Sequence, residues 1–284
     1  MLRAVRVVAS RGRWRRKAIP LPALALAGVL LAGCGGATLD AAGSSPPTTL
    51  VRPATRDDPI SVVVSGDSVL DNLSDGLVPA LDFGGEAVVS HTWLLGLSRD
   101  AASRFEVRRT VAEAHPDVVV VLLGVWELDP LEGEIGTPGW ERRYRRDVLE
   151  PFVDMVTVDG AHLLWLGMPA IADPVPDDHL EELNRAFAAL GEEDPRVTFL
   201  DLGAVVEGPD GEFTEHLPGP DGDPVRVRQT DGLHFCPAGT VLADEMVLDF
   251  LARHWSVEVA DGWEGLDWTR SQGVERGEDR CPED

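Results

Sequence analysis

Apolar runs with the composition of β-strands alternate with segments of helical periodicity along the middle of the chain. The expected strands are short, and they cover residues 60–64, 87–90, 118–123, 163–166 and 197–200. The expected helices cover residues 69–81, 101–114, 140–156, 178–190 and 237–255. The run 118–123 is apolar throughout, which predicts a central strand that is buried on both faces. Five strands that are each followed by a helix predict an α/β fold, with a parallel sheet between two helical layers and right-handed crossovers.

The first 33 residues depart from this pattern and predict a secretory signal. They hold six arginines and Lys17 but no acidic residue, and residues 18–32 form an apolar run. A basic segment, a short apolar run and small residues before a cleavage site are typical of such signals, and the run is too short for a membrane span. The Leu-Ala-Gly-Cys tetrapeptide at 31–34 resembles the bacterial lipobox, which implies cleavage before Cys34 and lipidation of that cysteine. An ordinary signal that is cleaved elsewhere is the alternative.

Composition divides the rest of the chain into three parts. Residues 34–57 are rich in Gly, Ser, Thr and Pro and predict a flexible tether. Residues 58–256, about 200 positions, suit a single domain with a substantial core. Residues 257–284 are acidic and contain several glycines, so we expect a largely irregular tail, which Trp263 and Trp268 could pack against the domain.

Removal of the signal makes the chain strongly acidic. Seven of the 25 cationic residues lie in the signal, so 18 arginines remain against 49 acidic residues, a formal charge of −31. Such a surface repels nucleic acids and anionic headgroups. We therefore expect no nucleic-acid partner, and we expect the protein to be held at the outer side of the bacterial cell membrane only through the lipid on Cys34. The sequence contains no indication of an oligomeric state.

Two short motifs at opposite ends of the expected domain carry candidate chemistry. Gly66-Asp67-Ser68 follows the first strand and places Ser68 at a strand-to-helix turn, beside a helix N-terminus that is partly positive. Taken alone, the motif is equally ordinary as turn and helix-capping residues. Asp231 lies three residues before His234 on a loop that opens the last helix, so its carboxylate can hold one imidazole nitrogen as N–H while the other takes a proton from a serine.

The order and spacing of these motifs resemble the SGNH, or GDSL-type, hydrolase family over residues 58–256. In that family Gly-Asp-Ser lies near the start of the domain and Asp-x-x-His near its end. The resemblance implies a flavodoxin-like three-layer α/β/α fold with strand order 2-1-3-4-5, and it makes Ser68 the nucleophile, His234 the base and Asp231 the group that orients the base. The alternatives are a loop-capping aspartate beside a surface histidine and, more remotely, a metal pair. The Pro- and Gly-rich segment 208–230 could form one wall of the cleft.

The expected oxyanion hole departs from the family. Its donors there are usually the nucleophile's N–H, a glycine N–H after the second strand and an asparagine side chain after the third. Ser68 and Gly96 match the first two donors. The usual Gly-x-Asn-Asp is replaced by Gly-Val-Trp-Glu at 124–127, so Trp126 occupies the position of the asparagine. The indole N–H could replace the amide, or Trp126 could be a packing residue on the cleft wall. Trp126 followed by Glu127 is similar to SGNH domains associated with bacterial envelope O-acyltransferases.

These observations together predict an extracytoplasmic serine esterase that hydrolyses or transfers O-acyl groups. Acetyl is the expected acyl group, and an acylated carbohydrate or another small ester is the expected substrate. No cofactor or metal is expected, because no cluster of His and Cys ligands is evident. The alternative is an envelope lipoprotein without catalytic activity, which binds a glycan or acyl ligand on the same fold. The missing asparagine motivates that alternative.

The three cysteines predict one disulfide. If Cys34 is lipidated and the chain is exported, Cys236 and Cys281 remain in a compartment where disulfides persist. A bond between them would attach the tail to the loop that carries His234. Two unrelated free thiols are the alternative.

Overall fold

The structure, a computed structural model, describes residues 51–82, 85–98, 100–131, 133–172, 177–259, 261–275 and 278–282. The expected signal, the lipidation site at Cys34 and the tether up to residue 50 lie outside the described residues. No helix among these residues combines the length and the apolar composition that crossing a bilayer requires.

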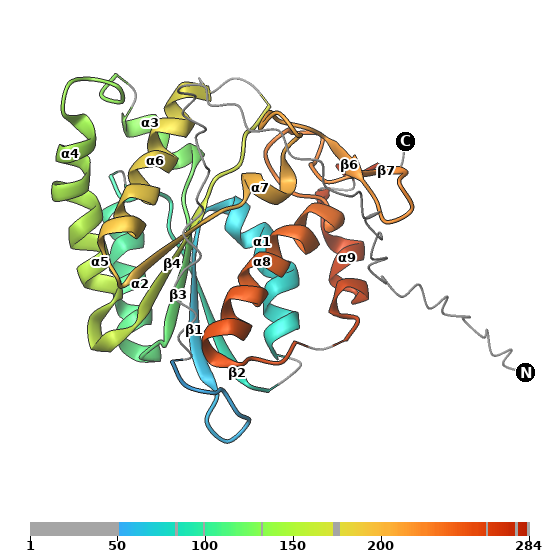
Figure 1. Cartoon of the computed structure of the whole chain (residues 1–284), viewed down its shortest axis with the longest axis horizontal. Helices are drawn as coiled ribbons and strands as arrows, with labels where there is room; N and C mark the ends of the chain where they lie inside the picture. The colour runs from blue at the N-terminus through green and yellow to red at the C-terminus, as the bar shows by residue number, and fades with distance from the viewer. Residues whose placement is uncertain are drawn as a thin grey trace, which may run out of the picture.

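A parallel five-stranded sheet forms the centre of the molecule (Figure 1). The strand order is β2-β1-β3-β4-β5, so the expected order 2-1-3-4-5 and the three-layer α/β/α fold are confirmed. All residues of β3 are buried, as the continuous apolar run predicts for a central strand. The strands are β1 (Ile60–Gly66), β2 (Ala87–Trp93), β3 (Val118–Leu122), β4 (His162–Gly167) and β5 (Val197–Asp201).

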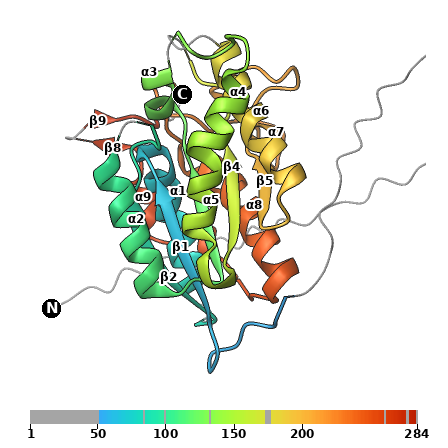
Figure 2. The same ribbon diagram turned by 90° about the vertical axis from the view of Figure 1, so that its left-hand side faces the viewer.

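Two helical layers cover the sheet, and Figures 1 and 2 show them on opposite faces. One layer is formed by α1 (Ser68–Asp82) and α8 (Pro237–Trp255), and the other by α2 (Ala101–Ala114), α5 (Glu150–Val156) and α6 (Asp177–Glu193). Shorter elements lie beyond the carboxyl ends of the strands. These are α3 (Val125–Leu131), α7 (Gly203–Val206) and the hairpin of β6 (His216–Pro218) and β7 (Pro224–Arg226), which lies within the segment 208–230.

Two helical regions differ from the expectation. The helix expected over 140–156 consists of α4 (Trp140–Tyr144), a π-helical turn η1 (Arg145–Leu149) and α5, which follow one another without a break. Helix α3 was not expected, because an element of two turns is too short to show a helical period in the sequence. It nevertheless carries Trp126 and Glu127, and it therefore matters for the site.

The chain before residue 58 is part of the folded domain, which corrects the expected end of the tether. The N–H groups of Val51 and Ala54 donate to the carbonyls of His254 and Trp255, at 2.8 and 2.6 Å. These carbonyls lie in the last turn of α8, where no partner within the helix exists for them. Arg52 forms an ion pair with Asp117 at 2.8 Å. Residues 51–57 are therefore bound to the amino-terminal edge of the sheet and to the end of α8.

The C-terminal segment is also more ordered than expected. It contains η3 (Trp263–Gly265), α9 (Trp268–Ser271) and a small hairpin of β8 (Val274–Glu275) and β9 (Glu278–Asp279). Trp263 and Trp268 are buried, with ring centroids 6.2 Å apart, and the Trp268 indole N–H donates to the Trp263 carbonyl at 3.0 Å. Both η3 and α9 pack against α1. The two tryptophans thus attach the tail to the domain.

Candidate active site

The carboxyl ends of β1, β2 and β3 meet at the start of α1. Gly66, the last residue of β1, is in register with Trp93 of β2 and with Leu122 of β3. A Cβ at residue 66 would lie 2.5 Å from the Leu122 carbonyl oxygen and 2.7 Å from the Cβ of Leu70, so only glycine fits where the chain turns into the helix. Ser68 is then the first residue of α1, and its side chain projects at this edge of the sheet.

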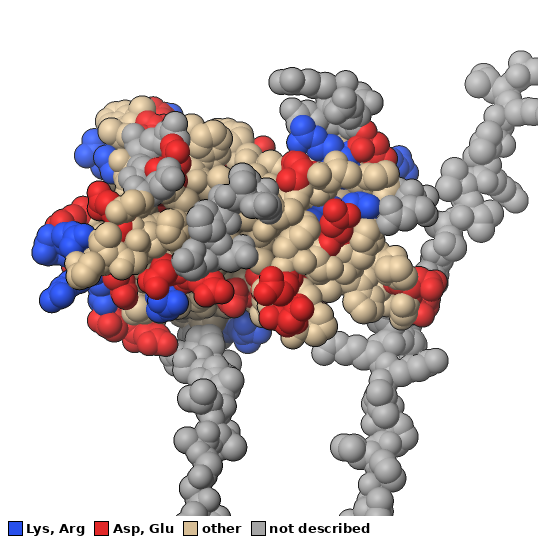
Figure 3. Space-filling view, turned by 90° about the horizontal axis from the view of Figure 1, so that it is seen from above, with Lys and Arg blue, Asp and Glu red and all other residues tan. Residues whose placement is uncertain are grey.

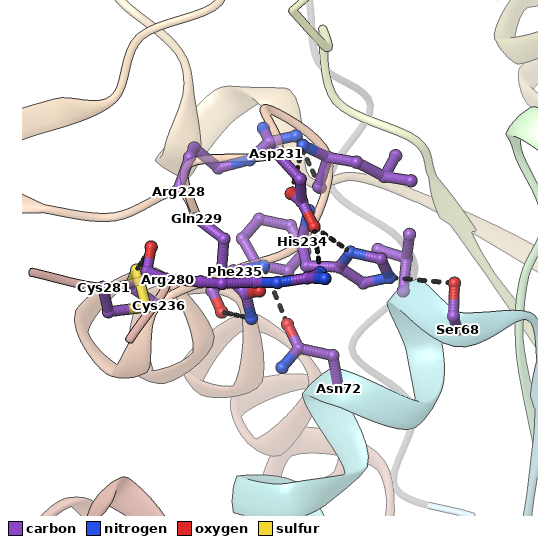
Figure 4. A network of polar contacts seen from close by, with 12 residues as sticks. Ser68, Asn72, Arg228, Gln229, Asp231, His234, Phe235, Cys236, Arg280 and Cys281 are labelled. Atoms are coloured by element: carbon purple, nitrogen blue, oxygen red, sulfur yellow. Dashed lines mark hydrogen bonds and ion pairs between the residues drawn. A yellow bond between two sulfur atoms is a disulfide. The ribbon is translucent and has the colours of Figure 1, made fainter. Parts of the chain in front are cut away.

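Ser68, His234 and Asp231 form a continuous chain of hydrogen bonds, which Figure 4 shows. His234 Nε2 lies 2.9 Å from Ser68 Oγ, and Nδ1 lies 2.8 Å from Asp231 Oδ2. Because an ionised carboxylate only accepts hydrogen bonds, Nδ1 carries the proton and Nε2 is the basic nitrogen. Both ring nitrogens of His234 therefore have protein partners, which leaves neither for a metal ion.

Asp67 ties the turn before Ser68 to the segment after β3. Its Oδ1 accepts the Val69 N–H at 3.0 Å, and its carboxylate also accepts the N–H of Gly124. Burial raises the pKa of Asp67 to about 6, although these hydrogen bonds favour the ionised form. Asp67 therefore fixes the distance between the nucleophile turn and the start of α3.

A buried arginine holds the loop that carries His234. Arg228 donates to the carbonyls of Ala170 and Leu233, at 3.0 and 2.9 Å. Its guanidinium lies between the rings of Phe213 and Phe235, 5.2 and 4.9 Å from their centroids. Burial lowers the pKa of Arg228 to about 10, which leaves it cationic at neutral pH. The loop is thus joined to the segment after β4.

A second set of contacts joins the same loop to α1. Asn72 lies one turn after Ser68, and its Oδ1 accepts the Phe235 N–H at 2.7 Å. Gln229 closes the loop on itself, because its backbone N–H donates to the His234 carbonyl at 2.8 Å and its side chain donates to the Phe235 carbonyl at 3.0 Å. Nucleophile and base are therefore held by neighbouring turns of one helix.

The C-terminal segment supplies the last support of the loop. Cys236 and Cys281 form the disulfide that the sequence predicts, with an S–S distance of 2.01 Å. The carbonyl of Arg280 accepts the Thr230 N–H at 2.9 Å, and the guanidinium of Arg280 donates to Asp231 Oδ2 at 3.0 Å (Figure 4). The tail therefore reaches the orienting carboxylate itself.

Asp231 is ionised because its donors outweigh its burial. Partial burial acts to raise the pKa of Asp231, but the hydrogen bonds from the His234 ring and from the N–H groups of Leu233 and His234 hold it well below the ordinary value. Those two N–H groups lie 2.9 and 3.0 Å from Oδ1. The carboxylate thus keeps its charge and its orientation over the whole physiological pH range.

Two of the three expected oxyanion donors are backbone N–H groups, those of Ser68 and Gly96. Ser68 begins α1, so its N–H has no partner within the helix. Among the described residues, neither this N–H nor that of Gly96 has a protein acceptor. Gly96 adopts a φ of +123°, a conformation that favours glycine. Trp126, the third expected donor, is 44% exposed on α3, and its carbonyl oxygen lies 3.3 Å from the position of a Cβ at residue 96.

Glu127 was not assigned a role from the sequence, yet it is central to this region. It is fully buried, and its carboxylate accepts hydrogen bonds from the N–H groups of Leu97 and Ser98, from Ser98 Oγ at 2.7 Å and from the Tyr144 hydroxyl at 2.8 Å. Burial raises the pKa of Glu127, and the donors of Ser98, Tyr144 and Leu97 oppose this effect. A glutamate between apolar neighbours directly after a buried strand is the signal that could have revealed it.

The surface around the strand ends is mixed in charge. Seen from above these ends, acidic side chains lie around the rim with arginines among them, and uncharged surface extends between them (Figure 3). Exposed apolar side chains follow the second and third strands, since Trp93 and Leu95 are 46% and 38% exposed. With Trp126 they provide apolar contact surface near the candidate site.

The sequence of residues 61–249 matches the model of the family described as "Protein of unknown function (DUF459)". Among solved structures, the chain is similar to a proposed GDSL-like lipase from Parabacteroides merdae, with 12% identity, 72% of this chain and 99% of that chain covered, and a TM-score of 0.44. It is similar to a family 3 carbohydrate esterase from Clostridium thermocellum, with 15% identity, 68% of this chain and 95% of that chain covered, and a TM-score of 0.40. It is also similar to a catalytic mutant of an acetylxylan esterase from Geobacillus stearothermophilus, with 15% identity, 75% of this chain and 97% of that chain covered, and a TM-score of 0.42. No curated protein matches the sequence.

Proposed function

Since this chain belongs to the DUF459 family, a family of SGNH/GDSL-like hydrolases, we propose that it is a serine esterase that acts on O-acyl groups. The observation that carries this proposal is the hydrogen-bonded sequence of Ser68, His234 and Asp231. A nucleophile, a base and an orienting carboxylate in this order are what acyl transfer requires.

The proposed reaction follows from the positions of these atoms. Ser68 Oγ attacks the carbonyl carbon of the ester while His234 Nε2 takes the hydroxyl proton. The N–H groups of Ser68 and Gly96 donate hydrogen bonds to the carbonyl oxygen as its negative charge develops. The leaving alcohol takes the proton from His234, and an acyl-serine remains. Water or a second hydroxyl group then attacks this intermediate with His234 again acting as base, which regenerates Ser68.

The proposed substrate is an uncharged carbohydrate that carries a short O-acyl ester, and acetyl is the first candidate for the acyl group. The acidic surface disfavours polyanions, and the exposed side chains of Trp93, Leu95 and Trp126 offer apolar contacts to an uncharged ring. Water and a sugar hydroxyl are both retained as acceptors, so the activity is that of a hydrolase or of a transferase. The proposed location is the outer side of the cell membrane, with attachment through a lipidated Cys34.

The first test uses the domain from residue 51 onward, with acyl-nitrophenyl esters of increasing chain length and then acetylated glycans. We expect hydrolysis that Ser68→Ala abolishes, together with labelling of the wild-type protein, but not of Ser68→Ala, by a fluorophosphonate. Asp231→Asn should keep the fold and lose activity by about 10⁴-fold, because the imidazole tautomer is no longer fixed. Ester hydrolysis by Ser68→Ala at the wild-type rate would refute this mechanism.

The same experiment decides between the enzyme and the non-catalytic alternative. A folded wild-type domain that neither reacts with the fluorophosphonate nor hydrolyses any ester would favour the binding protein. Addition of a sugar acceptor to the wild-type reaction separates the two enzymatic modes, because a transferase forms an acylated sugar at the expense of free acid. For the proposed location, Cys34→Ala should remove incorporation of a labelled fatty acid into the full chain.

A further inference from the structure

Glu127 is a buried carboxylate without a described cation as its partner. Its acceptor capacity is instead filled by four donors, namely two backbone N–H groups, one serine hydroxyl and one tyrosine hydroxyl. Transfer of a carboxylate from water into a protein interior costs several kcal/mol unless hydrogen bonds compensate for the lost hydration. An apolar side chain of similar size would avoid this cost. The arrangement therefore calls for a reason other than packing.

The donors show which segment the carboxylate organises. Leu97 and Ser98 belong to the loop after β2, Tyr144 ends α4, and Glu127 itself lies on α3 after β3. The carboxylate therefore bridges the two strand ends that flank β1 and Ser68. A Cβ at residue 96 would lie 2.8 Å from Glu127 Oε2, so the position of the carboxylate also requires a glycine there.

Two features of the loop concern the N–H groups next to this bridge. Immediately after Gly96, the N–H groups of Leu97 and Ser98 both turn toward Glu127. The N–H of Gly96 has no protein acceptor among the described residues, and its φ of +123° turns the peptide away from an extended course. The carboxylate thus takes up the donors on one side of the turn and leaves that of Gly96 for another acceptor.

We propose that Glu127 is a positioning residue that shapes the oxyanion hole, by holding the loop 96–98 so that the Gly96 N–H faces the carbonyl oxygen of the substrate. This inference rests on the proposed esterase function. Glu127 does not contact the reacting atoms and takes no proton in the reaction. Its effect is confined to the stabilisation of the oxyanion, which is realised in the transition state.

The chemistry of the donors shows which substitution removes the bridge. Glu127 Oε2 accepts the N–H groups of Leu97 and Ser98, and Oε1 accepts the hydroxyls of Ser98 and Tyr144. Glutamine can retain this arrangement, because its oxygen can accept the two N–H groups while its NH₂ group donates to the two hydroxyls. Leucine is similar in size and accepts no hydrogen bond, so Glu127→Leu removes the interactions that hold residues 97 and 98.

The test compares wild type and Glu127→Leu on 4-nitrophenyl acetate and on the corresponding thionoester. A thionoester places sulfur where the oxyanion forms, and sulfur accepts N–H hydrogen bonds poorly. We expect kcat for the oxygen ester to fall about 10- to 100-fold with little change in KM, because a displaced oxyanion donor is costly. We expect kcat for the thionoester to fall less than threefold, so the ratio of the two rates falls at least several-fold. The surface variant Glu113→Leu on α2 is the matched control and should leave both rates unchanged.

Ser98→Ala and Tyr144→Phe keep the proposal testable if Glu127→Leu does not fold. Each removes one hydroxyl donor from the carboxylate, and each should lower the ester-to-thionoester ratio in the same direction by a smaller factor. Equal losses for ester and thionoester, or a full wild-type rate in Glu127→Leu, would overturn the inference while leaving the esterase intact. Absence of Ser68-dependent hydrolysis in the wild type would overturn the proposed function and this inference together.

Discussion

Trp126 occupies the position at which the resembled family carries an asparagine that donates to the oxyanion. The residue is 44% exposed. It lies on the same short helix as Glu127, and its carbonyl lies beside Gly96. A role of its indole N–H as a third donor to the oxyanion stays a prediction from the sequence.

Trp126→Phe tests this role, because it keeps a ring and deletes the donor. We expect kcat for an oxygen ester to fall about tenfold, less than for the loss of a principal donor, since the N–H groups of Ser68 and Gly96 remain. KM should stay within a factor of two. Unchanged kinetics would make Trp126 a packing residue.

The residues of this site that the sequence identifies lie in short motifs with a local signature. Asp231 and His234 are three positions apart on one loop, and Ser68 lies in a turn with its own signature. Glu127, Asn72 and Arg280 act on residues 30, 163 and 49 positions away in the sequence. Such pairings depend on which strand ends become neighbours and on how loops fold over them, and no local pattern encodes this.

Among the elements, α1 and α8 pack closely around an unpaired carboxyl group. Gly76 allows the approach, because a Cβ there would lie 2.5 Å from Asp244 Oδ2 and 3.1 Å from side-chain atoms of Thr240 and Trp268. Asp244 is fully buried, and neither carboxyl oxygen has a hydrogen-bond partner among the described residues. Burial, with a smaller contribution from Asp75, raises the pKa of Asp244 well above its ordinary value. The group is therefore protonated in the folded protein under conditions in which the unfolded chain ionises it.

Asp244→Asn should consequently stabilise the domain at neutral and alkaline pH. An acid whose pKa is raised by folding contributes stability below its unfolded pKa and loses it as pH rises toward the folded pKa. The wild type should lose up to about 1.4 kcal/mol of unfolding free energy per pH unit from this group above pH 4, and the variant should not. Denaturant unfolding of both proteins between pH 4 and 8 measures the difference. A gap between them that does not widen with pH would contradict the proposed protonation state.

The sheet and the long helices were predictable at this scale, and the short elements were not. Apolar strands and amphipathic helices carry their burial pattern in their own residues, so β3 or α6 can be found without knowledge of the fold. Helix α3 is held instead by contacts of Glu127 with the loop after β2, and the small hairpin of β8 and β9 is held beside the disulfide. Their stability comes from tertiary partners.

At the scale of the whole molecule, the disulfide connects the C-terminal segment to the loop of the base. It spans 45 positions, and by loop entropy alone such a bond contributes about 4 kcal/mol at most. It also holds Arg280 against Asp231 and Thr230.

We expect the double variant Cys236→Ser/Cys281→Ser to unfold at lower denaturant concentration and to lose several-fold in kcat/KM under conditions in which it is still folded. Treatment of the wild type with a thiol reductant should reproduce both effects, and treatment of the variant should do nothing further. Full activity of the folded double variant would show that the bond supports stability alone. Arg280→Ala, with the disulfide intact, separates the ion pair from the covalent restraint.

The contact between Arg280 and Asp231 also sets an order of events during biosynthesis. The ribosome makes Ser68 early and Cys281 near the end of synthesis. The loop that carries His234 is therefore completed late, because its disulfide joins Cys236 to a cysteine 45 positions further along the chain. For a chain exported as proposed, that bond forms only after the last segment has crossed the membrane into an oxidising compartment. The nucleophile would thus exist throughout translocation without a fully held base, and esterase activity would rise to its final level only outside the cytoplasm.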